Sequence, residues 1–279
     1  MALRNLVRSS IATSCGARKL TPRLSRVAAA SVLALGIAAT PRPVNAAATE
    51  YVALGDSYSS GTGSRDYYDP GCQRSNYSYP ALTAQRIGAT LDLQACSGAT
   101  VQDVTANQLA ALNAEVDYVT MTVGGNDAGF SDVLFECAQP GWASDCDGVV
   151  DDAQAYIRDV LPGSLDGLYG EIASRAPNAT VVIGSYPRLF NGEDCNAGTW
   201  FSPAEQQRLN ETADQLASTI GAQASAHGFG LADVRNAFVG HAVCDGEAWI
   251  NGLSNPVGES YHPNRDGYVG YADVFGGVL

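Results

Sequence analysis

Short apolar runs alternate along most of the chain with longer segments whose apolar residues recur at helical spacing. The apolar runs have the length of buried strands and lie at 50–54, 91–96, 118–123, 180–183 and 229–234. Helical spacing or capping signals mark 79–87, 104–112, 149–161, 164–175, 203–227 and 265–274, and 130–147 combines a short helix with a loop. Strands that alternate with helices in this way favour a doubly wound α/β fold with a mostly parallel sheet.

Three polar, glycine-rich turns follow three of the expected strands. They contain Ser57 within 54–61, Gly98, and Asn126 within 124–127. The carboxyl ends of parallel strands meet at one edge of the sheet, where open α/β folds bind their ligands. The serine turn by itself fits a nucleophile, a phosphate-binding turn or a plain tight turn equally well. The convergence of all three turns on one edge is the stronger indication of a functional site.

The first 48 residues have a different character from the rest of the chain. A basic stretch without acids precedes an apolar, alanine-rich run at 27–40, and prolines and small residues follow it. This order is typical of a secretory signal peptide, expected to be cleaved near Ala46 to Ala48. The apolar run is too short to span a bilayer comfortably, which disfavours an uncleaved anchor. We therefore expect a secreted, extracellular protein with one α/β domain over 49–279.

The charge balance restricts the partners of that domain. Seven of the 16 basic residues but none of the 29 acidic residues precede Glu50, so nine arginines face 29 acids thereafter, a net charge of −20. Such a surface repels nucleic acid and is not attracted to anionic membranes. We expect no nucleic-acid partner, no stable membrane insertion and a monomer.

Six cysteines remain after residue 48, and an even number in an exported chain suggests three disulfides. Six cysteines allow fifteen pairings, of which the sequential one is the simplest. It would join Cys72 to Cys96, Cys137 to Cys146, and Cys195 to Cys244. The cysteines lack the close spacing of zinc ligands and histidines are scarce, so no metal is expected.

A serine becomes a nucleophile only when a base removes its proton, and the whole chain has three histidines. His227 is explained as a residue at a helix end, and His241 as a loop residue without polar neighbours. His262 stands before Pro263 at an expected helix start, which would hold its ring in a defined place. Taken alone, His262 is more simply interpreted as a structural histidine.

The same turns offer hydrogen-bond donors for an oxyanion. The candidates are the Ser57 N–H, the Gly98 N–H and the side-chain amide of Asn126. Gly98 would let a substrate approach the backbone closely, and Asn126 follows two glycines that leave room around it. Each feature alone has an ordinary structural explanation. Their occurrence together, in this order and on converging loops, favours an acyl-transfer site.

These blocks resemble the SGNH (GDSL) hydrolase superfamily. The resemblance rests on 55–61, Gly98, 124–127 and 262–264, and it extends over essentially the whole chain after the leader. The six-cysteine layout and the stretch at 95–100 look most like secreted actinobacterial (Streptomyces-type) lipases and esterases, whose cysteines form three sequential disulfides. The fold that this resemblance implies is a single three-layer α/β/α domain, flavodoxin-like in its sheet.

The resemblance also implies roles for individual residues. Ser57 would attack an ester carbonyl, with His262 as its base, while the Ser57 and Gly98 amides and Asn126 would hold the oxyanion. No cofactor is implied. The sequence departs from the common pattern at Glu259, because the family usually has aspartate three residues before the histidine. Either Glu259 or the backbone carbonyl of Ser260 would then orient the imidazole.

The function that follows is a secreted serine ester hydrolase, a lipase or esterase acting on small-molecule or lipid esters, phospholipids included. One alternative is a carbohydrate O-acetyl esterase, which the same fold can support. An alternative of another class is an inactive surface- or carbohydrate-binding module. Four aromatic residues either line an acyl groove or pack under the disulfide loops: Trp142, Trp200, Phe201 and Trp249.

Overall fold

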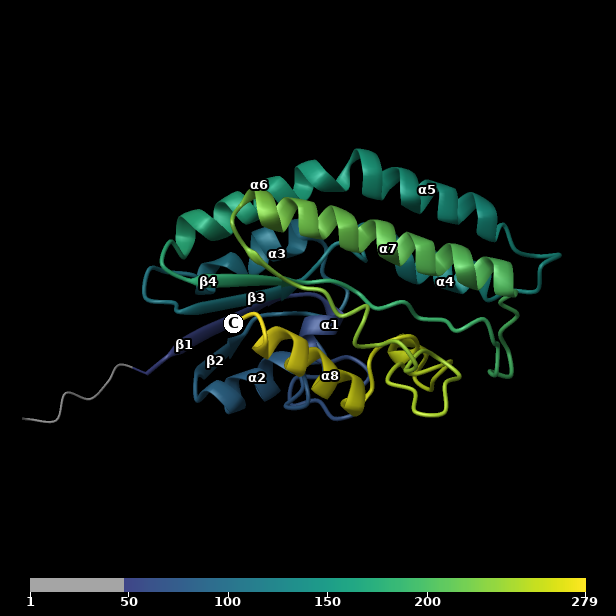
Figure 1. Cartoon of the computed structure of the whole chain (residues 1–279), viewed down its shortest axis with the longest axis horizontal. Helices are drawn as coiled ribbons and strands as arrows, with labels where there is room; N and C mark the ends of the chain where they lie inside the picture. Colours follow the sequence, from purple (N-terminus) through teal and green to yellow (C-terminus); the bar gives the residue numbers. More distant parts are fainter. Residues whose placement is uncertain (1–47) are drawn as a thin grey trace, which may run out of the picture. The chain divides into compact units, whose positions relative to one another are not determined.

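A five-stranded parallel sheet forms the centre of the part of the chain that the computed structural model describes, residues 48–279 (Figure 1). The expected signal peptide, apart from Ala48, lies outside the described residues. The strands are β1 (Glu50–Gly55), β2 (Thr90–Leu93), β3 (Tyr118–Thr122), β4 (Thr180–Gly184) and β5 (Gly230–Ala232). Their order is β2-β1-β3-β4-β5 and every neighbouring pair is parallel. This is the flavodoxin-like doubly wound order, and it confirms the expected fold class.

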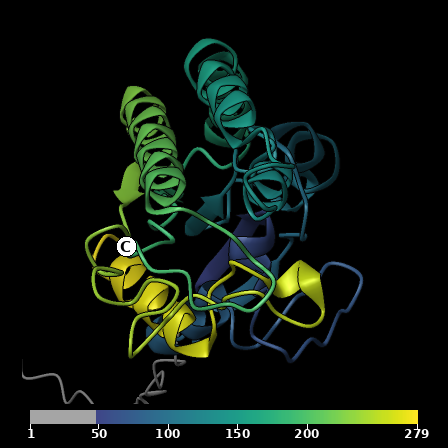
Figure 2. The same ribbon diagram turned by 90° about the vertical axis from the view of Figure 1, so that its right-hand side faces the viewer.

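The helices cover both faces of the sheet. Figures 1 and 2 show α3, α4, α5, α6 and α7 over one face and α2 and α8 over the other, which gives three layers. The α-helices are α1 (Ser57–Ser60), α2 (Tyr79–Ile87), α3 (Val101–Asn107), α4 (Phe130–Cys137), α5 (Cys146–Asp159), α6 (Leu161–Arg175), α7 (Pro203–Ala226) and α8 (Arg265–Gly276). Two short 3₁₀ helices are η1 (Leu109–Ala111) and η2 (Val257–Glu259). No helix of residues 48–279 has both the length and the apolar character needed to cross a bilayer.

The central strands are buried on both faces, as their continuous apolar sequences require. In β1, β3 and β4, only the first residue of each strand is not buried. β2 lies at the edge and is more exposed. The apolar stripe of α7, which includes Leu209, Leu216 and Ile220, belongs to the same core cluster. The core therefore holds the carboxyl ends of β1 and β3 side by side.

Several expected elements have different bounds, and for two of them the structure shows the reason. The strand expected at 91–96 ends at Leu93, because the N–H groups of both Gln94 and Ala95 donate to the Ala53 carbonyl and the chain turns away. The helix expected at 104–112 begins earlier, at Val101, where Thr100 and Asp103 form a capping box. The last expected strand, 229–234, is shortened to β5.

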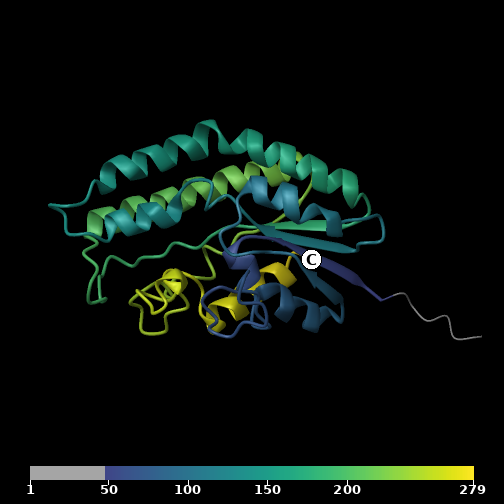
Figure 3. The same ribbon diagram turned by 180° about the vertical axis from the view of Figure 1, so that it is seen from behind.

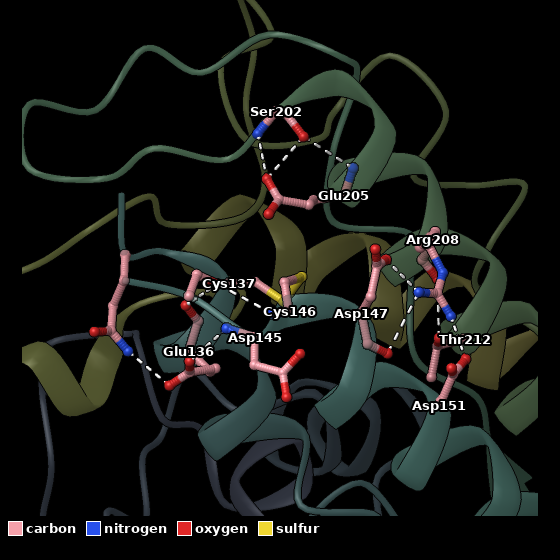
Figure 4. The surroundings of a disulfide bond; sticks show 12 residues. Glu136, Cys137, Asp145, Cys146, Asp147, Asp151, Ser202, Glu205, Arg208 and Thr212 are labelled. Carbon is pink, nitrogen blue, oxygen red and sulfur yellow. Dashed lines mark hydrogen bonds and ion pairs between the residues drawn. A yellow bond between two sulfur atoms is a disulfide. The ribbon is translucent and has the colours of Figure 1, made fainter. Parts of the chain in front are cut away.

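Three disulfides join cysteines that are sequential along the chain: Cys72–Cys96, Cys137–Cys146 and Cys195–Cys244. This is the simplest of the fifteen pairings open from the sequence. Figure 4 shows the second disulfide, which closes the loop between α4 and α5. The loops that follow the strands extend from one end of the sheet, as Figures 1 and 3 show.

Candidate active site

The turn at the end of β1, residues 55–61, is fixed in two ways: a close backbone approach that only glycine allows, and hydrogen bonds from a buried glutamine. Gly55 has φ +118°, and a Cβ there would lie 2.2 Å from the Thr122 carbonyl oxygen. The side chain of Gln108 accepts from the Gly55 N–H at 2.7 Å and donates to its carbonyl at 2.9 Å. Ser57 is the first residue of α1, and no described residue accepts a hydrogen bond from its N–H. The turn thus presents both the hydroxyl and the amide of Ser57.

Ser57 lies against His262, although 205 positions separate them. His262 Nε2 is 2.8 Å from Ser57 Oγ, and its Nδ1 is 2.9 Å from the Ser260 carbonyl oxygen. The histidine is placed by the start of α8, where the Asn264 side chain accepts from the Gly267 N–H at 2.9 Å. Since a neutral carbonyl can only accept, Nδ1 carries the proton and Nε2 faces the serine as an acceptor.

Glu259 does not contact His262. Its carboxylate is 3% exposed and accepts from the Tyr67 hydroxyl at 2.7 Å, with Arg65 Nε at 3.4 Å. Tyr261, with φ +60°, reverses the chain between Ser260 and His262 and brings the Ser260 carbonyl to the imidazole. Of the two partners left open by the sequence, the structure places the backbone carbonyl at Nδ1.

Burial controls the protonation of His262. It lowers the pKa of His262 from its ordinary value of 6.5 to about 4, and the Ser260 carbonyl opposes this shift only in part. The ring lies 5.2 Å, centroid to centroid, from that of Tyr58, which packs beside it. At neutral pH the imidazole is therefore uncharged and able to accept a proton.

The other two expected oxyanion donors, Gly98 and Asn126, follow β2 and β3. Asn126 donates from Nδ2 to the Ala99 carbonyl at 2.9 Å, and its second amide hydrogen has no acceptor among residues 48–279. Gly98 has φ +84°, and no described residue accepts from its N–H. Ser57, Asn126 and His262 line one pocket, whereas Gly98 lines a depression beside it. The Asn126–Ala99 bond joins the two.

A buried network behind the serine turn was not foreseen from the sequence. Asp56, 1% exposed, accepts from the Tyr58 N–H at 3.0 Å, the Thr122 hydroxyl at 2.7 Å and the Tyr186 hydroxyl. Burial raises the pKa of Asp56 to about 6, against the effect of these bonds. The Tyr186 hydroxyl also accepts from the Gly125 N–H at 3.3 Å. Because Tyr186 follows β4, the sheet-edge rule applied to the expected strand 180–183 points to it.

The pocket has apolar walls from two helices. Phe130 and Leu134 of α4 line it together with Ala213 and Leu216 of α7. Within residues 48–279, no three His, Cys, Asp or Glu side chains are grouped as metal ligands.

The remaining aromatic and histidine candidates have separate environments. Phe201 packs on Phe190, and Trp249 stacks on the ring of His241 at 3.7 Å between centroids, so both are packing residues. Trp142 and Trp200 are exposed. His241 was expected to lack polar neighbours, which is wrong: its Nδ1 is 2.7 Å from the Glu247 carbonyl oxygen. His227, at the end of α7, lies 2.9 Å from an oxygen of Asp166.

The sheet order and the sequence blocks at its carboxyl edge define the class of the SGNH (GDSL) hydrolases. The chain belongs to the GDSL-like Lipase/Acylhydrolase family, whose model matches residues 53–269, and it is a carboxylic ester hydrolase. It is 41% identical to a lipase of Streptomyces rimosus, over 94% of this chain and 96% of that one.

Solved structures show the same relationship. An extracellular lipase from Streptomyces rimosus is 42% identical with a TM-score of 0.77, and it matches over 83% of this chain and all of that one. A phospholipase A1 from Streptomyces albidoflavus is 39% identical with a TM-score of 0.79, over 84% of this chain and 100% of the other.

Proposed function

We propose that the chain is a secreted lipase or esterase that cleaves fatty-acyl esters, phospholipids among them, through an acyl-enzyme on Ser57. The observation that carries the proposal is the 2.8 Å contact between Ser57 Oγ and His262 Nε2, with Nδ1 anchored on the Ser260 carbonyl. The apolar pocket walls and the names of the relatives, lipase and phospholipase A1, support the acyl substrate.

In the first half of the reaction, neutral His262 takes the Ser57 proton on Nε2 as Oγ attacks the ester carbonyl carbon. The imidazolium that forms donates from Nδ1 to the Ser260 carbonyl, which holds the ring in position. The oxyanion accepts from the Ser57 and Gly98 N–H groups and from the Asn126 amide. His262 then gives its proton to the leaving alcohol as the tetrahedral intermediate collapses to the acyl-enzyme.

In the second half, water takes the place of the alcohol. His262 removes a proton from the water, which attacks the acyl carbonyl, and the same donors hold the second oxyanion. Proton return to Ser57 Oγ releases the fatty acid and restores the starting state. No step requires a charged partner for the imidazole, because the base starts neutral and its charge lasts only until the proton is passed on.

Secretion is part of the same proposal. Residues 1–48 serve as the signal peptide, cleaved near Ala46 to Ala48, and the remaining chain of 49–279 acts outside the cell. Three disulfides agree with an oxidising compartment. Edman sequencing of the protein recovered from culture medium tests the cleavage position: a protein that begins with Met1 contradicts it.

Hydrolysis of a chain-length series tests the chemistry. We expect the domain 49–279 to cleave p-nitrophenyl butyrate, octanoate and palmitate better than acetate, and the Ser57→Ala variant to lose nearly all turnover. A fluorophosphonate should label Ser57 and not the variant, as mass spectrometry of the tryptic peptide would show. Turnover confined to acetate would indicate an O-acetyl esterase, and turnover that survives in Ser57→Ala would refute the mechanism.

A further inference from the structure

Large apolar side chains gather, exposed, around one groove at the edge of the active-site pocket. Four of them line this groove and form what we call the apolar rim: Phe135, Trp200, Leu253 and Val257. Their exposed fractions lie between 40% and 71%. They come from three separate parts of the chain, namely α4, the loop 185–202 and the segment 251–260. Exposed apolar side chains scattered singly need no explanation, but a group around one groove indicates a binding surface.

The groove is continuous with the pocket that holds Ser57. Leu134, Tyr261 and His262 line both, with Ser131 and Ser260. Leu134 projects from the helix that also carries Phe135 of the rim. An acyl chain that enters between the rim side chains therefore has the side chains of Leu134 and Tyr261 beside it where the groove meets the pocket of the serine and the imidazole.

The rim is held on a rigid frame. The Cys137–Cys146 disulfide fixes the end of α4 to the start of α5 (Figure 4), and Cys195–Cys244 closes the loop that carries Trp200. The Trp200 N–H donates to the Ala138 carbonyl at 3.1 Å, which ties that loop to α4. These contacts fix the parts of the chain that carry Phe135 and Trp200.

Charge around the rim specifies the kind of surface that it fits. Asp132 is the only charged residue that lines the groove. Arg65, which reaches the segment 251–260 through Ser254, is paired with Glu259. From Glu50 onward the chain has nine arginines against 29 acids. A strongly acidic protein with no free cation at the groove is repelled by anionic lipid and gains only from apolar insertion.

We propose that the apolar rim docks the protein on an electrically neutral lipid surface, with zwitterionic phosphatidylcholine as its representative, and that the groove leads one acyl chain from that surface to Ser57. This inference rests on the proposed function for the fate of the acyl chain. The docking step itself requires no hydrolysis, so it can be measured apart from catalysis.

Binding is measured on the Ser57→Ala protein, residues 49–279, by sedimentation with sucrose-loaded vesicles of dioleoylphosphatidylcholine. The rim variant carries Phe135→Ser and Val257→Ser in addition. The matched control carries Tyr68→Ser and Val239→Ser, which also removes one exposed aromatic and one exposed valine, at positions that do not line the groove. We expect the partition coefficient to fall about tenfold or more for the rim variant and less than about twofold for the control.

Two further measurements separate this inference from the proposed function. The protein should bind vesicles that contain phosphatidylglycerol no more tightly than it binds neutral vesicles. With Ser57 restored, the rim changes should lower phosphatidylcholine hydrolysis on vesicles more than hydrolysis of dissolved p-nitrophenyl acetate. Three results would each overturn the docking: equal vesicle binding by the rim and control variants, no vesicle binding at all, or a rim-dependent dimer in sedimentation velocity in place of vesicle binding. In each case, turnover of dissolved esters would still support the hydrolase. Failure to cleave any ester refutes the proposed function and leaves the vesicle result to stand by itself.

Discussion

In the proposed mechanism, the pH dependence of turnover is set by the imidazole of His262, which has no carboxylate partner. Burial lowers the pKa of His262 to about 4, and its Nδ1 faces a neutral carbonyl, which stabilises the imidazolium only weakly. The base must be neutral to act. A lowered pKa therefore preserves the active form below pH 6.5, and activity is lost only as the pH falls through about 4.

The expected effect is large enough to measure at a single pH. At pH 5, a histidine with a pKa of about 4 is about 90% neutral, whereas one at the ordinary 6.5 is about 3% neutral. The value of kcat/KM at pH 5, relative to its plateau at higher pH, is therefore about 30 times larger for the lower pKa than for the ordinary one. The predicted profile is thus flat from pH 8 to about pH 5 and falls tenfold per unit below pH 4.

The assay is kcat/KM for p-nitrophenyl butyrate from pH 3.5 to 8, with samples quenched and brought to one alkaline pH before the nitrophenolate is read. Asp56 complicates the middle of the range, because burial raises the pKa of its carboxyl to about 6. The Asp56→Asn variant keeps the helix cap and removes that titration. An acid limb near pH 6.5 that persists in Asp56→Asn would refute the account of His262.

Three other substitutions test separate parts of the site. Asn126→Ala should lower kcat on the order of 10²–10³-fold with little change in KM, and a loss below tenfold would remove Asn126 from the oxyanion donors. Glu259→Gln should keep kcat within about threefold, since its carboxylate contacts Tyr67 rather than the imidazole; a loss beyond a hundredfold would make it the true partner. Tyr186→Phe leaves a buried carboxylate oxygen of Asp56 and the Gly125 N–H without a partner. It should lower the free energy of unfolding, measured in urea, by about 1–3 kcal/mol, and a change near zero would contradict this role of Tyr186.

The sheet and the helices around it could be predicted because their signals are local. The helix expected at 79–87 coincides with α2, since Ser78 and Pro80 mark its start and Gly88 its end. Ser202 and Glu205 likewise fix the start of α7. The three turns at the sheet edge follow directly from strand order, which places Ser57 after β1 and Asn126 after its neighbour β3.

Contacts between residues distant in sequence could not be predicted. Gln108 supports the serine turn from 53 positions away, and no sequence pattern indicates this contact. The sheet-edge rule places Tyr186 near the site, but it does not indicate the bond to Asp56, 130 positions away. The choice between Glu259 and the Ser260 carbonyl depends on the positive φ of Tyr261, a conformation that tertiary packing imposes. The sequence left both partners open, and the bend of the chain at Tyr261 brings the Ser260 carbonyl to the imidazole.

The distance along the chain between Ser57 and His262 has a consequence for the order in which the protein is made. Tyr268 of α8 donates to the carbonyl oxygens of Ser57, at 3.3 Å, and Thr62, at 2.6 Å, so the last helix of the domain packs directly behind the serine turn. In the proposed mechanism, a growing polypeptide holds an inert serine until His262 and α8 have been made and α8 packs behind the serine turn. The hydrolase that we propose therefore gains activity only after the chain has been made beyond His262, 205 positions after Ser57.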